Sequence, residues 1–345
     1  MVHLRVVAPP EIAGQALELL KGSGSVCNVI LLEGAALKPA GDVILCDVAR
    51  EDASLIVEDL KELDIPAQGS IALEYIDTQI SDAADRAEKH APGLPSDAVI
   101  WEDVEQRTEE LTQLSFFFVA FMVLAMLIAA IGILLDQPIL IVGAMVVGPE
   151  FGPLAGLCVA LVEKRRQLVH RSLAALGVGF PVGVAVTVMV SLLLDAAGLI
   201  PVDFKTDDHP LTGFISNPDF FSFLVAYVAG TAGVLSLTSA KSGALIGVLI
   251  SVTTIPAAAN VGLAGALGDW REASGAAAQL GVNLAAIVIA GVVTLFLQRR
   301  WYVMRRVRHL GDPARGAAGL PIGRSGRGSP GKASAAHLKA KEPAE

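Results

Sequence analysis

The stretch that decides the fold reads Gly143-Ala144-Met145-Val146-Val147-Gly148-Pro149-Glu150-Phe151-Gly152-Pro153. It lies inside an apolar run long enough to cross a bilayer, which takes about 20 residues. Between residues 148 and 153, two prolines, two glycines and one carboxylate interrupt the helical pattern. Proline lacks a backbone donor, and lipid tolerates such a break only where protein or water satisfies the freed backbone groups. We therefore expect 148–153 to mark a site inside a membrane protein.

Composition and charge agree with that class. Of the 345 residues, 53% are hydrophobic, and the mean hydropathy of +0.58 is typical of proteins with several membrane spans. The net charge of −9 is unevenly distributed: residues 1–112 carry 22 acidic and 8 basic side chains, whereas residues 298–345 carry 11 basic and 3 acidic ones. The apolar composition predicts that the chain lies in a lipid bilayer, and the net negative charge argues against nucleic acid as a partner.

Six apolar segments are predicted to span the membrane. They lie at about 115–135, 138–162, 168–194, 220–240, 243–263 and 276–297. Lysines and arginines follow the second and sixth segments, whereas the 195–219 loop is acidic. The positive-inside rule then places both chain termini in the cytoplasm, which an even number of spans also requires.

The sequence predicts four parts, which are the membrane region and three segments that flank it. Residues 1–77 show a βαββαβ order, which predicts an α+β domain with the ferredoxin-like arrangement. Residues 78–114 are predicted to be a linker followed by a charged helix, and 115–298 the six-span membrane domain. Residues 299–345 are predicted to be a basic, mostly disordered cytoplasmic tail, because apolar periodicity is missing there.

The membrane region contains an internal repeat. A shift of 104 residues places Phe116-Phe117 on Phe220-Phe221 and Gly143 on Gly247, and the second element of each half is interrupted. Three spans per half is an odd number, so the halves would have opposite orientations. Inverted repeats with matching broken helices are typical of transporters whose sites lie between the repeats. We therefore predict two inverted three-helix repeats with broken second helices.

Glu150 is the main candidate for a functional residue. It precedes Gly152-Pro153 and so lies near the N-terminus of a half-helix, where the dipole and free amides stabilise negative charge. In one interpretation it binds a cation or exchanges a proton; in the other its carboxylate only caps the half-helix. The predicted substrate- or ion-binding residues of this break are Gly148, Pro149, Glu150, Gly152 and Pro153.

The matching break supplies a second set of candidates, which are Thr253, Thr254, Pro256 and Asn260. Their hydroxyl and amide groups are suited to lining a polar cavity opposite Glu150. The alternative is that Thr hydroxyls bond backbone carbonyls and that Asn260 bridges helices by hydrogen bonds. Both interpretations stay open at this stage.

Motifs for catalysis, metals and cofactors do not appear in the sequence. There is no P-loop, GxSxG, GxGxxG or HExxH motif, and the three cysteines show no CxxC spacing. We therefore predict no catalytic residue, no metal site and no cofactor, and do not expect an enzyme; an intramembrane enzyme is a third, minor alternative.

The run 140–149, followed by Gly152-Pro153-Leu154-Ala155-Gly156-Leu157, resembles the prokaryotic "uncharacterised hydrophobic domain" family, a domain of unknown function (number 389). The resemblance covers about 113–297. It implies a multi-span protein of the prokaryotic inner (plasma) membrane, with a small soluble domain beside it. One departure concerns the site, because many family members carry Ser-Pro and then apolar residues where this chain has Gly148-Pro149-Glu150-Phe151.

Two functions compete on these grounds. The leading hypothesis is a transporter or channel for a small solute or ion, with its site between the breaks at 148–153 and 253–256 and a cytoplasmic regulatory domain. The alternative is a membrane-anchored sensor or scaffold whose N-terminal domain binds a metabolite or partner. In either case we expect a homo-oligomer.

Overall fold

The computed structural model describes residues 1–200, 215, 219–239 and 254–325. The chain divides into two compact units, and each is described by itself. Unit 1 contains Met1–Asp103 and Gln298–Glu345, and unit 2 contains Val104–Leu297. Two helices, α5 (Trp101–Leu111) and α13 (Trp270–His309), contribute residues to both units.

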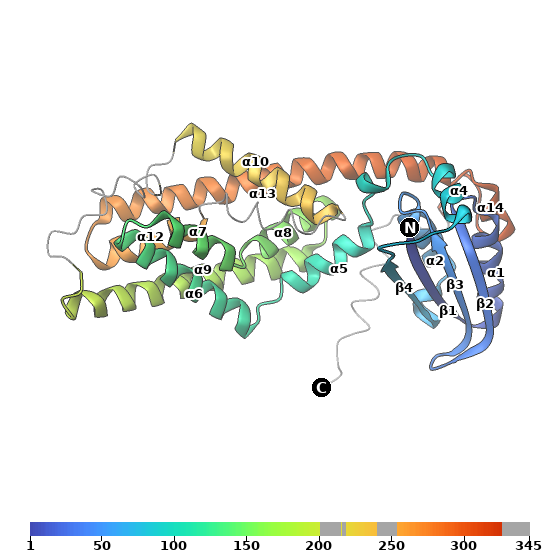
Figure 1. The fold of residues 1–345 in the computed structure, drawn as a ribbon, viewed down its shortest axis with the longest axis horizontal. Helices are drawn as coiled ribbons and strands as arrows, with labels where there is room; N and C mark the ends of the chain where they lie inside the picture. Colours follow the sequence, from blue (N-terminus) through green and yellow to red (C-terminus); the bar gives the residue numbers. More distant parts are fainter. Residues whose placement is uncertain (201–214, 216–218, 240–253, 326–345) are drawn as a thin grey trace. The chain divides into compact units, whose positions relative to one another are not determined.

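Unit 1 is built on a four-stranded antiparallel sheet with the strand order β2-β3-β1-β4 (Figure 1). Its strands and helices follow the order expected from the sequence. They are β1 (Val2–Ala8), α1 (Pro10–Gly22), β2 (Val26–Leu37), β3 (Ala40–Val48), α2 (Ala53–Glu62), α3 (Ile65–Gln68) and β4 (Ser70–Tyr75). Alternate residues of β1, such as Leu4 and Val6, are buried against α1 and α2 in one apolar core. This two-residue alternation is what a half-buried strand requires.

Residues 78–96 differ from the predicted linker because they contain ordered elements. Helix α4 (Asp82–His90) begins at Ser81, whose side chain accepts a hydrogen bond from the backbone N–H of Ala84 at 3.3 Å. A 3-10 turn, η1 (Pro95–Asp97), follows. Ala84 and Ala87 give α4 a narrow buried face, which is too small to show as apolar periodicity in so polar a segment.

The prediction of a disordered tail is wrong for residues 299–325. Helix α13 continues to His309, and a short helix, α14 (Pro313–Ala317), packs against α1. Ala314, Ala318 and Leu320 join the core of unit 1. A few apolar residues therefore anchor this segment, and they are too few to produce a periodic pattern. Residues 326–345 lie outside the described part of the chain.

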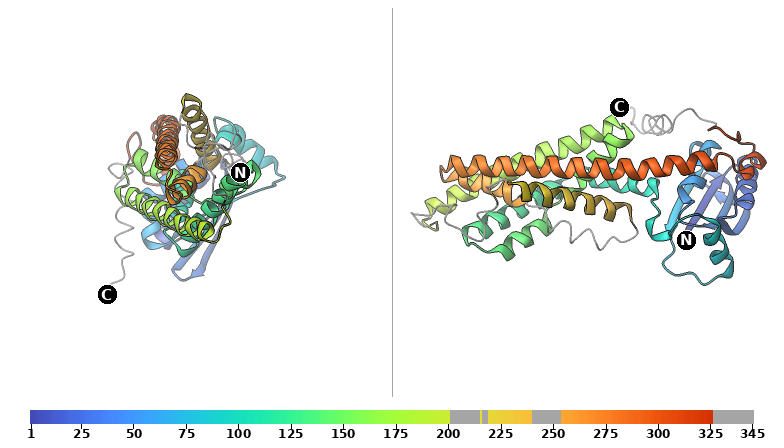
Figure 2. Two further views of the ribbon diagram at one scale, coloured as in Figure 1. Left: turned by 90° about the vertical axis from the view of Figure 1, so that its left-hand side faces the viewer. Right: turned by 90° about the horizontal axis from the view of Figure 1, so that it is seen from above.

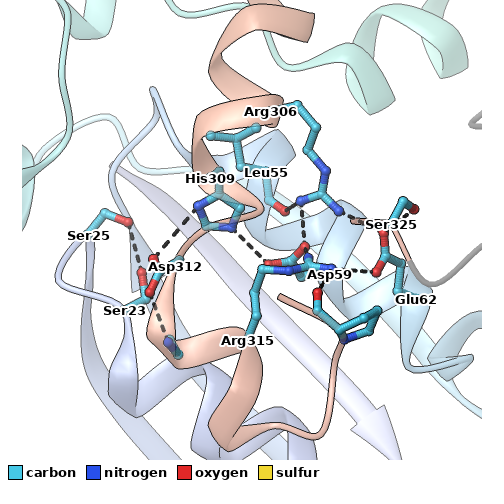
Figure 3. Close-up of polar contacts among 12 residues, drawn as sticks. Ser23, Ser25, Leu55, Asp59, Glu62, Arg306, His309, Asp312, Arg315 and Ser325 are labelled. Atoms are coloured by element: carbon cyan, nitrogen blue, oxygen red, sulfur yellow. Dashed lines mark hydrogen bonds and ion pairs between the residues drawn. The ribbon is translucent and has the colours of Figure 1, made fainter. Parts of the chain in front are cut away.

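A buried ionic cluster fastens the segment (Figure 3). Asp59 of α2 is 0% exposed and is bonded by Arg306 at 2.5 Å, by His309 at 2.8 Å and by Arg315, which is also 0% exposed. Glu62 pairs with Arg306 at 2.9 Å and with Arg315 at 2.7 Å. Burial alone would lower the pKa of Arg306, but Asp59 outweighs it and raises that pKa. The charge of a fully buried carboxylate is thus balanced by cationic partners.

Unit 2 is a helical bundle (Figure 2). Its helices, beside the ends of α5 and α13, are α6 (Phe116–Leu134), α7 (Pro138–Val147), α8 (Phe151–Glu163), α9 (Arg166–Ala196), α10 (Phe220–Thr238) and α12 (Thr254–Ala266). Four helices, α6, α9, α10 and α13, are long and apolar enough to cross a membrane. The α7–α8 pair passes the same test together but is bent by 51°, so the described residues hold four or five candidate spans.

The predicted break in the second segment is therefore present as the bend between α7 and α8. The corresponding break of the second half cannot be followed, because residues 240–253 lie outside the described part. The described part resumes with α12, which begins at Thr254. Pro256 is the third residue of α12, just as Pro153 is the third residue of α8. Proline is tolerated in a first helical turn because the N–H it lacks would have no partner there.

Two pairs of helices separated by about 104 residues have matching lengths, whereas α9 and α13, with 31 and 40 residues, do not. Helices α6 and α10 both have 19 residues and begin at Phe116 and Phe220. The side chains that precede them, Ser115 and Asp219, each accept a hydrogen bond from a backbone N–H of the first turn. The half-helices α8 and α12 both have 13 residues.

Both half-helices contact long helices of the opposite half, and α8 also packs against α9 of its own half. Ile255, Ala258 and Ala259 of α12 share a buried core with side chains of α6 and α9. Leu154 of α8 shares another core with Ala226 of α10 and with side chains of α13. The two halves of unit 2 are thus interlocked, and neither half contains its complete core.

We predict that Arg315→Met will destabilise unit 1 by about 3 kcal/mol, because removing one partner leaves Asp59 and Glu62 buried with less compensation. Amide hydrogen exchange of α2 and α14 in the full-length protein should become faster. The matched control is Arg308→Met, since Arg308 makes the same chemical change possible at an exposed position near the end of α13. Equal exchange in the two variants would contradict the structural role of the cluster.

Candidate functional site

The site begins with the local sequence between α7 and α8. Gly148 ends α7 in an extended conformation, with φ −64° and ψ 127°. A residue before proline is driven away from helical geometry, so Pro149 explains why α7 stops here. Glu150 then precedes α8 with helical backbone angles. The direction of the chain changes over only three residues.

Glu150 is buried, with 4% of its surface exposed. The hydroxyl group of Thr254 donates a hydrogen bond to its Oε1 atom at 2.7 Å. Glu150 makes no side-chain capping hydrogen bond to α8, so the simple capping interpretation does not describe its contacts. Instead, the carboxylate of the first break reaches across to the first residue of α12.

Gly148 permits this close approach. A Cβ atom at this position would lie 2.5 Å from Glu150 Oε2 and 2.6 Å from Cγ1 of Ile255. Both distances are shorter than van der Waals contact, so any side chain here would displace the side chains of Glu150 and Ile255. The glycine is therefore required by the contact with α12 as well as by the bend.

The other predicted residues fall into three groups. Pro149, Gly152 and Pro153 form the first break around Glu150, and Pro256 lies buried in the first turn of α12. Thr253 lies outside the described residues. Asn260 lies six residues beyond Thr254, about 9 Å along the helix. Its amide group donates a hydrogen bond to Oε1 of Glu272 at 3.2 Å, so it belongs to a second polar contact.

Sequence reasoning did not single out this second contact. Glu272 and Gln279 of α13 are buried, and the amide of Gln279 donates a hydrogen bond to Asn283 at 3.2 Å. Their spacing offers a signal, because residues 272, 276, 279, 283, 286 and 290 form one buried stripe along α13. Three polar side chains within such a stripe indicate an internal polar path. The predicted span from 276 left Glu272 in a loop, where an acid is unremarkable.

Oxygen acceptors without partners characterise the site. Among the described residues of unit 2, Glu150 Oε2, Asn260 Oδ1 and Gln279 Oε1 are buried and have no hydrogen-bond partner. Carboxylate and amide oxygens accept hydrogen bonds and do not donate them. Buried polar atoms are normally paired, so each of these oxygens calls for a donor or a cation. The described residues contain no group of three or more His, Cys, Asp and Glu side chains placed to hold a metal ion.

The chain is similar to a known protein family in its central part and to one further protein over most of its length. Residues 145–289 match a family model described as "Domain of unknown function (DUF389)". The chain is also similar to a protein of Methanocaldococcus jannaschii that is named only as uncharacterized. The two are 25% identical over 257 residues, which cover 73% of this chain and 76% of that protein. No solved structure matches.

Gly148→Ala should destabilise unit 2 by about 2 kcal/mol, since an extra methyl group in a close contact forces side chains and backbone apart. The measurement is thermal unfolding of the protein in detergent. Gly143→Ala is the matched control, because a Cβ atom there meets nothing within 4 Å. If both variants unfold like the wild type, the close contact between Gly148 and α12 is not formed.

Proposed function

This chain belongs to the DUF389 family, whose description assigns no activity, and from its own geometry we propose that it is a membrane transporter or channel for a small cation or proton. The pathway passes the contact between Glu150 and Thr254. The observation that carries the proposal is the half-satisfied carboxylate: Oε1 accepts a hydrogen bond from Thr254, and Oε2 has no partner among the described residues.

A carboxylate held in this way favours a positively charged or proton-donating ligand. An ionisable group among apolar spans is expensive and marks a functional site by default. Asp59 of unit 1 shows what a structural buried acid looks like here, since two arginines and a histidine surround it. Glu150 has one neutral hydroxyl instead. A transported cation or proton would provide the missing partner, and it would also suit the oxygens of Asn260 and Gln279.

The internal repeat supports a transporter. Glu150 and Thr254 are 104 residues apart, the same shift that relates α6 to α10. When two repeats are related by a two-fold axis, equivalent positions meet where the axis passes. The side chains that α8 and α12 bury against helices of the other half fit that symmetry. We therefore propose two inverted repeats with the site on their shared axis, as in transporters of known inverted-repeat folds.

Contacts near the start of unit 2 support the path of the chain through the membrane. Arg165, at the turn between α8 and α9, pairs with Glu105 at 3.6 Å and with Glu109 of α5. The turn therefore lies at the end of the bundle where the chain enters. Since α6 leaves that end, this contact supports an α7–α8 pair that returns to it as a full span despite its bend.

The division of the chain supports an even number of crossings. Unit 1 includes the residues on both sides of unit 2, which favours a chain that enters and leaves the membrane on the same side. Five crossings come from α6, α7–α8, α9, α10 and α13, and we place the sixth in the region containing α12. With lysine and arginine at 164–166, we propose that both termini are cytoplasmic and that the protein resides in the prokaryotic inner membrane.

We also propose that unit 1 has the ferredoxin-like arrangement, which its strand order supports. It would be the cytoplasmic regulatory domain of the transporter. In the alternative function, unit 1 is the domain of a sensor or scaffold that binds a metabolite or partner, and the spans only anchor and oligomerise it. Flux measurements separate the two functions, because only the transporter moves a solute through unit 2.

The proposed function predicts cation or proton flux in proteoliposomes that depends on Glu150. Glu150→Gln should reduce the flux by roughly tenfold or more, because the neutral amide no longer balances a charge. Thr254→Ser should retain most of the flux, and Thr254→Val should reduce it. Asp195→Asn, which removes an exposed acid at the end of α9, is the matched control. Equal flux in wild type and Glu150→Gln would remove Glu150 from the pathway, and no flux at all would favour the sensor.

The proposed topology is tested by reporters that are active only in the cytoplasm. Fusions to the N-terminus and to the C-terminus should both be active, since both ends of the chain belong to unit 1. Activity of one fusion alone would mean an odd number of crossings and would contradict the proposed path of the chain.

A further inference from the structure

Unit 1 contains a pocket that the proposed transport pathway does not use. It has a volume of about 350 Å³ and lies between α4, the residues that follow it and the start of α2. Its lining includes Glu51, Asp85, Glu88, Lys89 and Gly93. Small-molecule sites commonly begin at volumes of this order. The size therefore fits a small organic ligand.

The lining of the pocket is acidic. It includes three carboxylates, from Glu51, Asp85 and Glu88, and one ammonium group, from Lys89. One oxygen of Glu88 also accepts a hydrogen bond from the amino group of Met1 at 3.3 Å. Lys89 and the amino group of Met1 balance only part of this negative charge, and an excess of one sign of charge in a concave site concentrates ligands of the opposite sign. The pocket thus favours a cation.

Glu51 adds an observation that does not depend on the number of acids. Only 7% of this residue is exposed, and its Oε2 atom is buried without a hydrogen-bond partner among the described residues. Burial, together with the charges of Glu88 and Asp52, raises the pKa of Glu51. A buried carboxylate oxygen without a donor is unusual and requires an explanation. A ligand that donates a hydrogen bond from within the pocket would provide one.

Nearby arginines have other partners. The guanidinium group of Arg50 lies over the ring of Tyr75, 4.9 Å from its centroid. Arg305 Nη2 donates a hydrogen bond to Asp52 Oδ1 at 2.8 Å. A Cβ atom on Gly93 would lie 4.0 Å from Arg305 Nη1, so this arginine lies beside the pocket, where its charge lowers the pKa of Glu51 without cancelling the net increase. The acidic side chain therefore remains available to a ligand.

The arrangement also indicates which kind of cation fits. The described residues hold no cluster of three acids close enough to coordinate one metal ion. An ammonium group, in contrast, needs one carboxylate as a hydrogen-bond acceptor and other acids within electrostatic range. We propose that this pocket binds a small organic cation with a primary ammonium group, which donates to Glu51 while Asp85 and Glu88 balance the remaining charge. This proposal does not depend on transport by unit 2.

The test is isothermal titration calorimetry of the full-length protein in detergent at constant ionic strength. Putrescine, a diamine, is the probe, and tetramethylammonium is a cation that has no N–H donor. Putrescine should bind saturably and tetramethylammonium should not. Putrescine affinity should rise with pH through the pKa of Glu51, because the deprotonated carboxylate binds the cation.

Glu51→Gln should weaken putrescine binding by roughly tenfold or more, since a charge-assisted hydrogen bond is lost. Glu18→Gln makes the same chemical change at an exposed position of α1 and should leave the affinity unchanged. The double variant Asp85→Asn/Glu88→Gln should also weaken binding, which provides a second test if Glu51→Gln unfolds at a lower temperature.

Three results would overturn the proposal. Wild-type protein that binds no putrescine would exclude the site, and Glu51→Gln with wild-type affinity would place any binding elsewhere. Saturable binding of magnesium chloride in place of putrescine would assign the pocket to a metal ion. Flux through unit 2 is not part of the readout, so this proposal and the transport proposal fail separately.

Discussion

Burying a carboxylate among apolar helices is the constraint on which the account of unit 2 depends. An ionised group removed from water must find donors, a counter-charge or a proton, because its desolvation is otherwise very unfavourable. Glu150 finds one hydroxyl group, 2.7 Å away on Thr254, and that hydroxyl comes from the other half of the membrane region. The contact exists only because α7 stops at Gly148 and α12 begins beside it.

The packing around this contact follows the same requirement. Leu154 of α8 is buried with helices of the second half, and Ile255 of α12 is buried with helices of the first. Each half-helix therefore has its N-terminus near the contact and buries some of its apolar side chains against the opposite half. A rearrangement that opened the contact would also move the two half-helices against the long helices. Such coupling is what alternating access between inverted repeats requires.

Much of this could be predicted from the sequence because the signals are local and strong. The Gly148-Pro149 pair fixed the position of the bend, and the two-residue alternation around Leu4 fixed the strand in unit 1. Glu150 stood out as an acid within an apolar run. Asn260 was grouped with it because both follow a break, but helix α12 carries Asn260 about 9 Å away from Thr254, to Glu272.

The errors arose where long-range contacts replace local pattern. Asp59 lies within the apolar stripe of α2, and its partners Arg306 and Arg315 come from a segment that reads as a polar tail. Nothing in the local sequence of that tail shows that a buried acid more than 240 residues away fixes it. An acid in an apolar stripe, together with unpaired arginines elsewhere, is the signal that could have suggested the cluster.

The most direct test of the central claim observes the carboxyl group of Glu150 itself. Infrared difference spectroscopy of the protein in lipid would compare states before and after a change of cation concentration or pH. We predict a carboxyl band in the difference spectrum when the cation concentration or the pH changes. This band should be absent in Glu150→Gln and present in Asp195→Asn. A spectrum that does not change, or a change that persists in Glu150→Gln, would contradict the claim that Glu150 is the binding group.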